Sequence, residues 1–324
     1  MNFNKGSLEI AILSYRHPNS LFSETLLYLN DINNHLLILK MKIIITLFLF
    51  ISGILFSQNQ RFVYEYSFKM DTLNKDKVEK EIMNLDITKE GSYFYSALLI
   101  TRDSLVNAEV EKGKASNSIN IDFRKIRHPK VNFRISKTYP DLTTVYHTSL
   151  NASNVAVKEL NKMNWTVLPE TKNIEGFKAQ KATTHFGGRN WTAWFTNDIQ
   201  IQDGPYKFCG LPGLILQIVD EEETHIFNLA GSMKINDSFS LIDAKTAEIF
   251  LTKEKFNKLW NEYIQDPAKN IKLMHSTSGM SETILFDSNT GNPLSKQELI
   301  RNKETRAKEF LKRFNNFIEK DLYK

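Results

Sequence analysis

The stretch "KFCGLPGLILQIVD", Lys207–Asp220, decides the fold. Its four residues Leu211–Leu214 place proline second and glycine third, which predicts a type II turn, because proline presets φ and glycine accepts the positive φ that follows. The apolar run after the turn predicts a strand buried on both faces. A phosphate loop is disfavoured, because no Lys-Ser/Thr pair follows the glycines. We interpret the motif as structural; it comprises Gly210, Leu211, Pro212, Gly213, Leu214 and Ile215.

A second hairpin is predicted just upstream, where two strand-like runs meet at Gly187-Gly188. This link pairs Phe186 with Arg189 and His185 with Asn190, and it separates an apolar face from a polar one. A tryptophan on a polar face could bind a sugar, a peptide or another amphipathic ligand. The alternative is that a helix or loop covers this tryptophan. The candidate ligand-binding residues on that face are Lys181, His185, Asn190, Thr192 and Trp194.

Short alternating runs dominate residues 61–150 and predict further strands. The acidic run Asp220–Glu223 predicts a solvated hairpin tip, and the charged residues 101–114 predict a helical turn or a loop. An amphipathic helix is expected at 252–267, and a mobile loop at 268–293. The pair Ser295 and Glu298 predicts a capping box that opens a long C-terminal helix through Phe310, Phe314 and Ile318. The expected fold is mainly β (α+β), with a curved antiparallel sheet or half-barrel, a packed helix and this C-terminal helix.

The segment Met41–Gln60 has the pattern of a secretory signal peptide, with Lys42 before an apolar core of residues 43–56. We therefore interpret 1–40 as an upstream extension before the true start, 41–57 as the signal peptide and 58–324 as one exported domain. The alternative is a signal anchor behind a cytoplasmic tail, although the apolar core is shorter than the roughly 20 residues of a membrane helix. No integral membrane segment is expected after cleavage.

Composition and motifs point away from several classes of protein. The 42 basic and 37 acidic residues are interspersed, so no nucleic-acid surface is expected. The single cysteine, Cys209, lacks an adjacent histidine and is expected to be buried rather than catalytic. Histidines are scattered without metal-ligand spacing, so no metal and no cofactor are expected. No recognised hydrolase, lactamase or redox motif is present, and no catalytic residue is assigned.

The segment Trp165–Asp220 resembles the GLPGLI family of exported proteins of Gram-negative bacteria, through "GLPGLI", "GPYKF" and the "WTAWF" strand. Gly176–Ala182 lacks the cysteine that the family tends to carry there. The resemblance implies an exported protein, periplasmic or secreted, of unknown biochemical activity. We expect a non-catalytic protein of the cell envelope that binds an unknown ligand or partner protein. The alternative is an envelope hydrolase with no recognised motif.

Overall fold

The computed structural model describes residues 36–42, 59–74, 76–116, 127–151, 153–160, 162–236, 247–274 and 294–324. The chain divides into two compact units, Met1–Ser57 and Gln58–Lys324. Residues 36–42 of the first unit are helical and exposed. Most of the predicted signal peptide lies outside the described residues, so export stays a prediction. Within the described residues, no helix has the length and apolar character that crossing a membrane requires.

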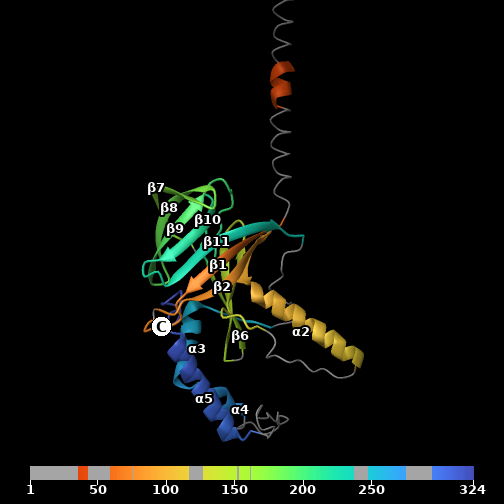
Figure 1. Ribbon diagram of the computed structural model, residues 1–324, viewed down its shortest axis with the longest axis vertical. Helices are drawn as coiled ribbons and strands as arrows, with labels where there is room; N and C mark the ends of the chain where they lie inside the picture. The colour runs from red at the N-terminus through yellow and green to blue at the C-terminus, as the bar shows by residue number, and fades with distance from the viewer. Residues whose placement is uncertain are drawn as a thin grey trace, which may run out of the picture. The chain divides into compact units, whose positions relative to one another are not determined.

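The second unit is built on strands, which Figure 1 colours by their position in the chain. The strands are β1 (Gln60–Phe68), β2 (Glu79–Ile87), β3 (Gly91–Ser96), β4 (Arg134–Thr138), β5 (Thr143–Leu150), β6 (Ser153–Leu160), β7 (Thr166–Ile174), β8 (Phe177–Phe186), β9 (Arg189–Thr196), β10 (Leu214–Asp220), β11 (His225–Lys234) and β12 (Ile249–Leu251). The helices are α2 (Ala97–Ser116), α3 (Lys253–Gln265), α4 (Lys269–Met274) and α5 (Lys296–Arg313).

All these strands form one open 12-stranded sheet in the order β12-β6-β5-β4-β3-β2-β1-β11-β10-β9-β8-β7. The pairings are antiparallel except for the parallel pair of β12 and β6. Helix α3 packs against β6 and β12, and α4 packs against α5, whereas α2 extends away from the sheet (Figure 1). The predicted fold class, a mainly β domain with a curved sheet and helices, is therefore confirmed.

The turn before β10 differs from the prediction. Gly213 does not take a positive φ; instead its N–H donates to the Leu211 carbonyl at 2.8 Å, which closes a three-residue γ-turn around Pro212. The positive φ belongs to Gly210, at 89°. Gly213 is required for another reason, because a Cβ there would overlap the carbonyl of Thr196 on β9. The type II turn is thus wrong, although the motif does start the buried strand.

Strand β10 confirms the expected burial on both faces at its start, where three successive residues, Leu214, Ile215 and Leu216, are fully buried. The preceding Cys209 is also buried, as expected. Burial raises the pKa of its thiol to about 11, so the thiol is protonated at neutral pH and is a poor nucleophile.

Two helix predictions need correction. Residues 97–116 form the full helix α2 rather than a single turn, and α2 buries few of its described side chains. Helix α5 has the predicted capping box at Ser295 and Glu298 but ends at Arg313. Phe314 caps that end, and Ile318 lies in an irregular segment that returns to the sheet. The loop expected at 268–293 begins instead with helix α4, Lys269–Met274, while its residues 275–293 lie outside the described residues, as does the strand-like run 118–126.

The hairpin of β8 and β9 has the predicted register, with Phe186 opposite Arg189 and His185 opposite Asn190. Both linking glycines have positive φ, 64° for Gly187 and 77° for Gly188, as a tight two-residue hairpin demands.

Candidate functional site

A cavity of about 620 Å³ lies between the sheet and the C-terminal part of the chain. Its walls come from β1, β5 and β11, from α3, from the end of α5 and from the irregular segment 314–323. Cavities of roughly 300–1,000 Å³ are typical of small-molecule sites. The strands reach this position because the sheet order brings β1 beside β11, although more than 150 residues separate them in the sequence.

Aromatic rings make most of the cavity wall. Trp260 of α3 meets Tyr323 edge to face with ring centres 4.9 Å apart, and Tyr323 stacks on Phe317 at 4.0 Å. At the cavity rim Phe310 and Phe314 stack at 4.8 Å, and Phe310 is exposed. Such rings present flat apolar faces, with fixed orientations, to whatever occupies the space.

Among the buried polar side chains that line the cavity, Glu319 and His225 are the titratable ones. Glu319 Oε1 accepts hydrogen bonds from the Tyr206 hydroxyl at 2.5 Å and from Lys207 Nζ at 2.6 Å. Among the described residues, Glu319 Oε2 has no hydrogen-bond partner. A buried acceptor without a partner costs about 1–3 kcal/mol.

The Tyr66 hydroxyl lies 2.7 Å from His225 Nδ1, within hydrogen-bond distance. The other ring nitrogen, Nε2, has no hydrogen-bond partner among the described residues. Burial lowers its pKa well below the ordinary value of 6.5, and the nearby Arg189 lowers it further, while the backbone of Asn316 opposes the fall. The imidazole is therefore neutral at neutral pH.

Lys207, the first residue of the stretch Lys207–Asp220, forms an ion pair with Glu319 of the cavity wall. Its ammonium group lies between Glu159 at 2.8 Å and Glu319 at 2.6 Å. Burial by itself would lower the pKa of Lys207, but the two carboxylates outweigh burial and raise it. Lys207 therefore stays charged and holds Glu319 in place.

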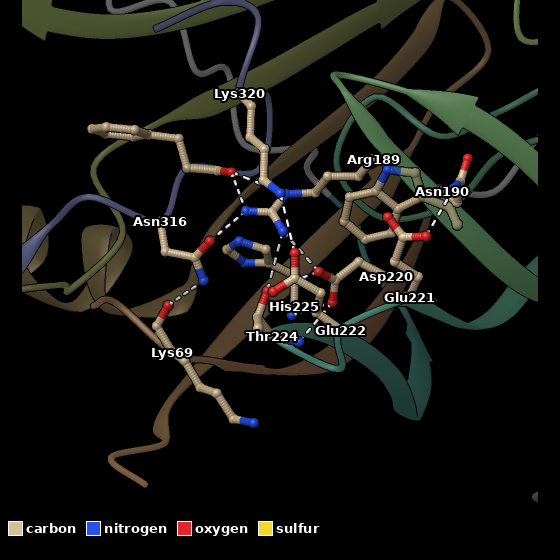
Figure 2. Close-up of polar contacts among 12 residues, drawn as sticks. Lys69, Arg189, Asn190, Asp220, Glu221, Glu222, Thr224, His225, Asn316 and Lys320 are labelled. Carbon is tan, nitrogen blue, oxygen red and sulfur yellow. Dashed lines mark hydrogen bonds and ion pairs between the residues drawn. The ribbon is translucent and has the colours of Figure 1, made fainter. Parts of the chain in front are cut away.

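Arg189, the first residue of β9, fixes the C-terminal segment that forms one wall of the cavity, and Figure 2 shows its polar contacts. The guanidinium donates to Asp220 at 2.8 Å and to the Phe317 carbonyl at 2.8 Å, and it also donates to Asn316. Asn316 in turn donates to the Lys69 carbonyl at 2.8 Å. These contacts join β9, β10 and the end of β1 to the segment after α5.

This network corrects the prediction of a wholly solvated acidic tip. Glu221, Glu222 and Glu223 are exposed, but Asp220 is fully buried and accepts from Arg189 and from Thr224 and His225 backbone N–H groups. The sequence did not distinguish the first of the four acidic residues from the others.

The polar hairpin face has the predicted arrangement but lies away from the cavity. His185 and Asn190 are exposed and hydrogen-bonded to each other at 2.9 Å, while Lys181 and Thr192 are half-buried. Trp194 is half-buried under the ammonium group of Lys172, 4.2 Å from the ring centre. A cation from β7, rather than a helix or loop, thus covers one side of this ring. Its role in ligand binding stays a prediction.

Acidification is expected to destabilise the domain through His225. Because its folded-state pKa is below the unfolded value, the unfolded chain binds the extra proton, and stability is lost as the pH falls below about 6.5. One such group removes about 1.4 kcal/mol of unfolding free energy between pH 7.5 and pH 5.5. His147, whose pKa burial also lowers, acts in the same direction. Urea unfolding at both pH values should show the loss, and His225→Gln should reduce it. An unchanged loss in this variant would contradict the assignment.

Within the described residues, no group of three His, Cys, Asp or Glu side chains is arranged to hold a metal ion. The aromatic cavity is the candidate site, and sequence reasoning missed it. The only sequence signal was the density of aromatic residues in β1, α3 and the last fifteen residues.

Comparison with known proteins gives one family match. A family model described as "N-glycanase peptide, N-terminal domain" matches residues 99–256. Two solved structures of PNGF-II, in the P21 and C2 space groups, are similar with a TM-score of 0.43 and 15% sequence identity. Each similarity covers 62% of this chain, and the chain spans about a third of the matched PNGF-II chains (33% and 32%). No curated protein matches.

Proposed function

We propose that this chain is an exported GLPGLI-type protein of the Gram-negative envelope that binds a carbohydrate-class ligand in the aromatic cavity. The observation that carries the proposal is the aromatic wall of a cavity of about 620 Å³. Sugars present apolar C–H faces, which stack on aromatic rings. The match to a domain of an N-glycanase supports a ligand of the glycan class.

The cavity favours binding over hydrolysis. Glycosidases commonly place two carboxyl groups on either side of the scissile bond. Of the described residues that line this cavity, Glu319 is the only carboxylate, and its charge is engaged by Lys207. His225 is neutral and hydrogen-bonded through one nitrogen to Tyr66. The described lining therefore lacks the second acidic group that glycoside cleavage uses.

Removing a rim ring should weaken glycan binding. Phe314→Ala deletes a half-buried ring at the rim and is expected to raise Kd about tenfold, since a ring contact contributes about 1 kcal/mol beyond the area it buries. Calorimetric titration of full-length mature protein with released N-glycan oligosaccharides measures this change. Phe250→Ala is the matched control, because Phe250 on β12 is 66% exposed and lies outside the cavity wall.

Trp194→Ala separates the two candidate surfaces, because Trp194 lies on the hairpin and not in the cavity wall. Unchanged binding in this variant, with weaker binding in Phe314→Ala, supports the cavity. Weaker binding in Trp194→Ala alone, with an unchanged melting temperature, would move the site to the hairpin and refute the cavity. If no oligosaccharide of the panel binds, the glycan class is refuted.

A further inference from the structure

Three polar side chains on β4, on β5 and just before β12 form a hydrogen-bonded chain that the proposed binding function does not use. Ser136 Oγ lies 3.0 Å from His147 Nε2, and His147 Nδ1 lies 2.9 Å from Glu248 Oε2. We propose that Ser136, His147 and Glu248 are the nucleophile, the general base and the positioning carboxylate of an acyl-transfer site that takes carboxylic esters. The proposal is independent of ligand binding in the cavity.

The sheet register places these groups together. His147 is directly opposite Arg134 in the antiparallel pair of β4 and β5, so Ser136, two residues further along β4, is its diagonal neighbour on the same face. Strand β6 lies between β5 and β12, and its Ala156 pairs with both His147 and Phe250, so Glu248, just before β12, reaches His147 across β6. Tyr146 and Thr148, which flank His147 in β5, line the aromatic cavity. Because side chains alternate along a strand, His147 faces the opposite side of the sheet.

Each member has the surroundings that its role needs. The His147 side chain is 4% exposed, and burial lowers its pKa, although Glu248 opposes the fall. A neutral imidazole at neutral pH is able to accept a proton. Glu248 accepts a hydrogen bond from Nδ1–H, which leaves the Nε2 lone pair directed at the Ser136 hydroxyl. Ser136 is half-buried rather than enclosed.

The reaction follows from this order of contacts. Ser136 Oγ attacks the ester carbonyl carbon while His147 Nε2 takes the hydroxyl proton. The bond from that carbon to the alkoxy oxygen then breaks, and the leaving alcohol receives the proton from His147. Water attacks the resulting Ser136 ester, His147 takes a proton from the water and returns it to Ser136 Oγ, and a carboxylic acid leaves. No oxidant, reductant or second substrate besides water is needed.

A purely structural reading makes a different prediction. In that reading, His147 and Glu248 only fasten the edge strand β12 to the sheet, and Ser136 is a bystander. Removing the serine hydroxyl would then change nothing but stability, and Ser136 would react no faster than any other serine. Reactivity of the Ser136 oxygen therefore distinguishes the two readings.

The test is covalent labelling of full-length mature protein with an alkyl fluorophosphonate, which phosphonylates an activated serine oxygen and releases fluoride. We expect one adduct, located at Ser136 by peptide mass spectrometry and absent in Ser136→Ala. His147→Gln should slow labelling at least a hundredfold, as loss of a general base does. Ser149→Ala is the matched control: Ser149 lies on the same strand as His147 but bonds Asn154 at 3.0 Å, and its removal should leave the labelling rate unchanged.

Glu248 orients His147 and does not touch the substrate. A loss of stability in a Glu248 variant would not reveal this role, so the labelling rate is measured as well. Glu248→Gln should slow labelling about tenfold, and Glu248→Asp, which retains the charge, should recover part of the rate at equal melting temperature. A parent protein that carries no adduct at Ser136, or a labelling rate that is unchanged in His147→Gln, overturns the proposal.

Discussion

Gly213→Ala is expected to destabilise the domain by about 3 kcal/mol or more, the upper part of the range for overpacking a buried site. An added Cβ would overlap the Thr196 carbonyl oxygen and lie 2.7 Å from its carbon. Both obstacles are backbone atoms of β9, so no side-chain rotation relieves the clash. Relief would require β9 and β10 to separate where Leu214 pairs with Thr196. Urea unfolding followed by tryptophan fluorescence measures the loss.

Gly231→Ala is the matched control for this substitution. Gly231 lies in β11 without a positive φ, and a Cβ there meets nothing within 4 Å. The variant should stay within about 1 kcal/mol of the parent, because only the intrinsic difference between glycine and alanine remains. If Gly213→Ala proves as stable as Gly231→Ala, the close contact between β9 and the γ-turn does not exist in solution.

Arg189→Met is expected to cost about 3–5 kcal/mol, as removal of one partner from a buried ion pair does. The side chains of Arg189 and Asp220 are 1% and 0% exposed, so the substitution leaves a buried carboxylate without its cation. It also removes the donors that hold the Phe317 carbonyl and Asn316. Hydrogen exchange should therefore accelerate in residues 315–323, which form one wall of the cavity, and ligand affinity should fall with it.

The double variant Arg189→Met with Asp220→Asn tests this explanation, because it removes the stranded charge along with the cation. It should be more stable than Arg189→Met alone. Lys320→Ala is the control within the same segment: its ion pair with Glu222 is exposed, 43% and 42%, and contributes little. A loss in Lys320→Ala equal to that in Arg189→Met would mean that the segment, and not the buried pair, carries the effect.

The candidate sites show how far local pattern extends. The hairpin register and the polar face around Trp194 followed from the Gly187-Gly188 link, because a two-residue turn fixes which residues pair. The buried state of Asp220 did not follow, because its partner Arg189 lies 31 residues away and the sequence does not show which acidic residue it contacts. The end of α5 was missed because the apolar spacing continues past Arg313 while the chain turns back to the sheet.

The sequence by itself determined the mainly β class, the hairpins, the buried strand after the GLPGLI motif and the burial of Cys209, all of which depend on residues close together in the chain. Tertiary structure alone decided three features: the close contact with Thr196 that requires glycine at 213, the aromatic cavity with Glu319, and the hydrogen bonds that link Ser136, His147 and Glu248. Each of these needs segments far apart in sequence to meet. Strand β9 meets the γ-turn, β1 meets the last ten residues, and His147 on β5 meets Glu248, which follows it by 101 residues. Periodicity shows which face of a strand is buried, but not which distant segment covers it.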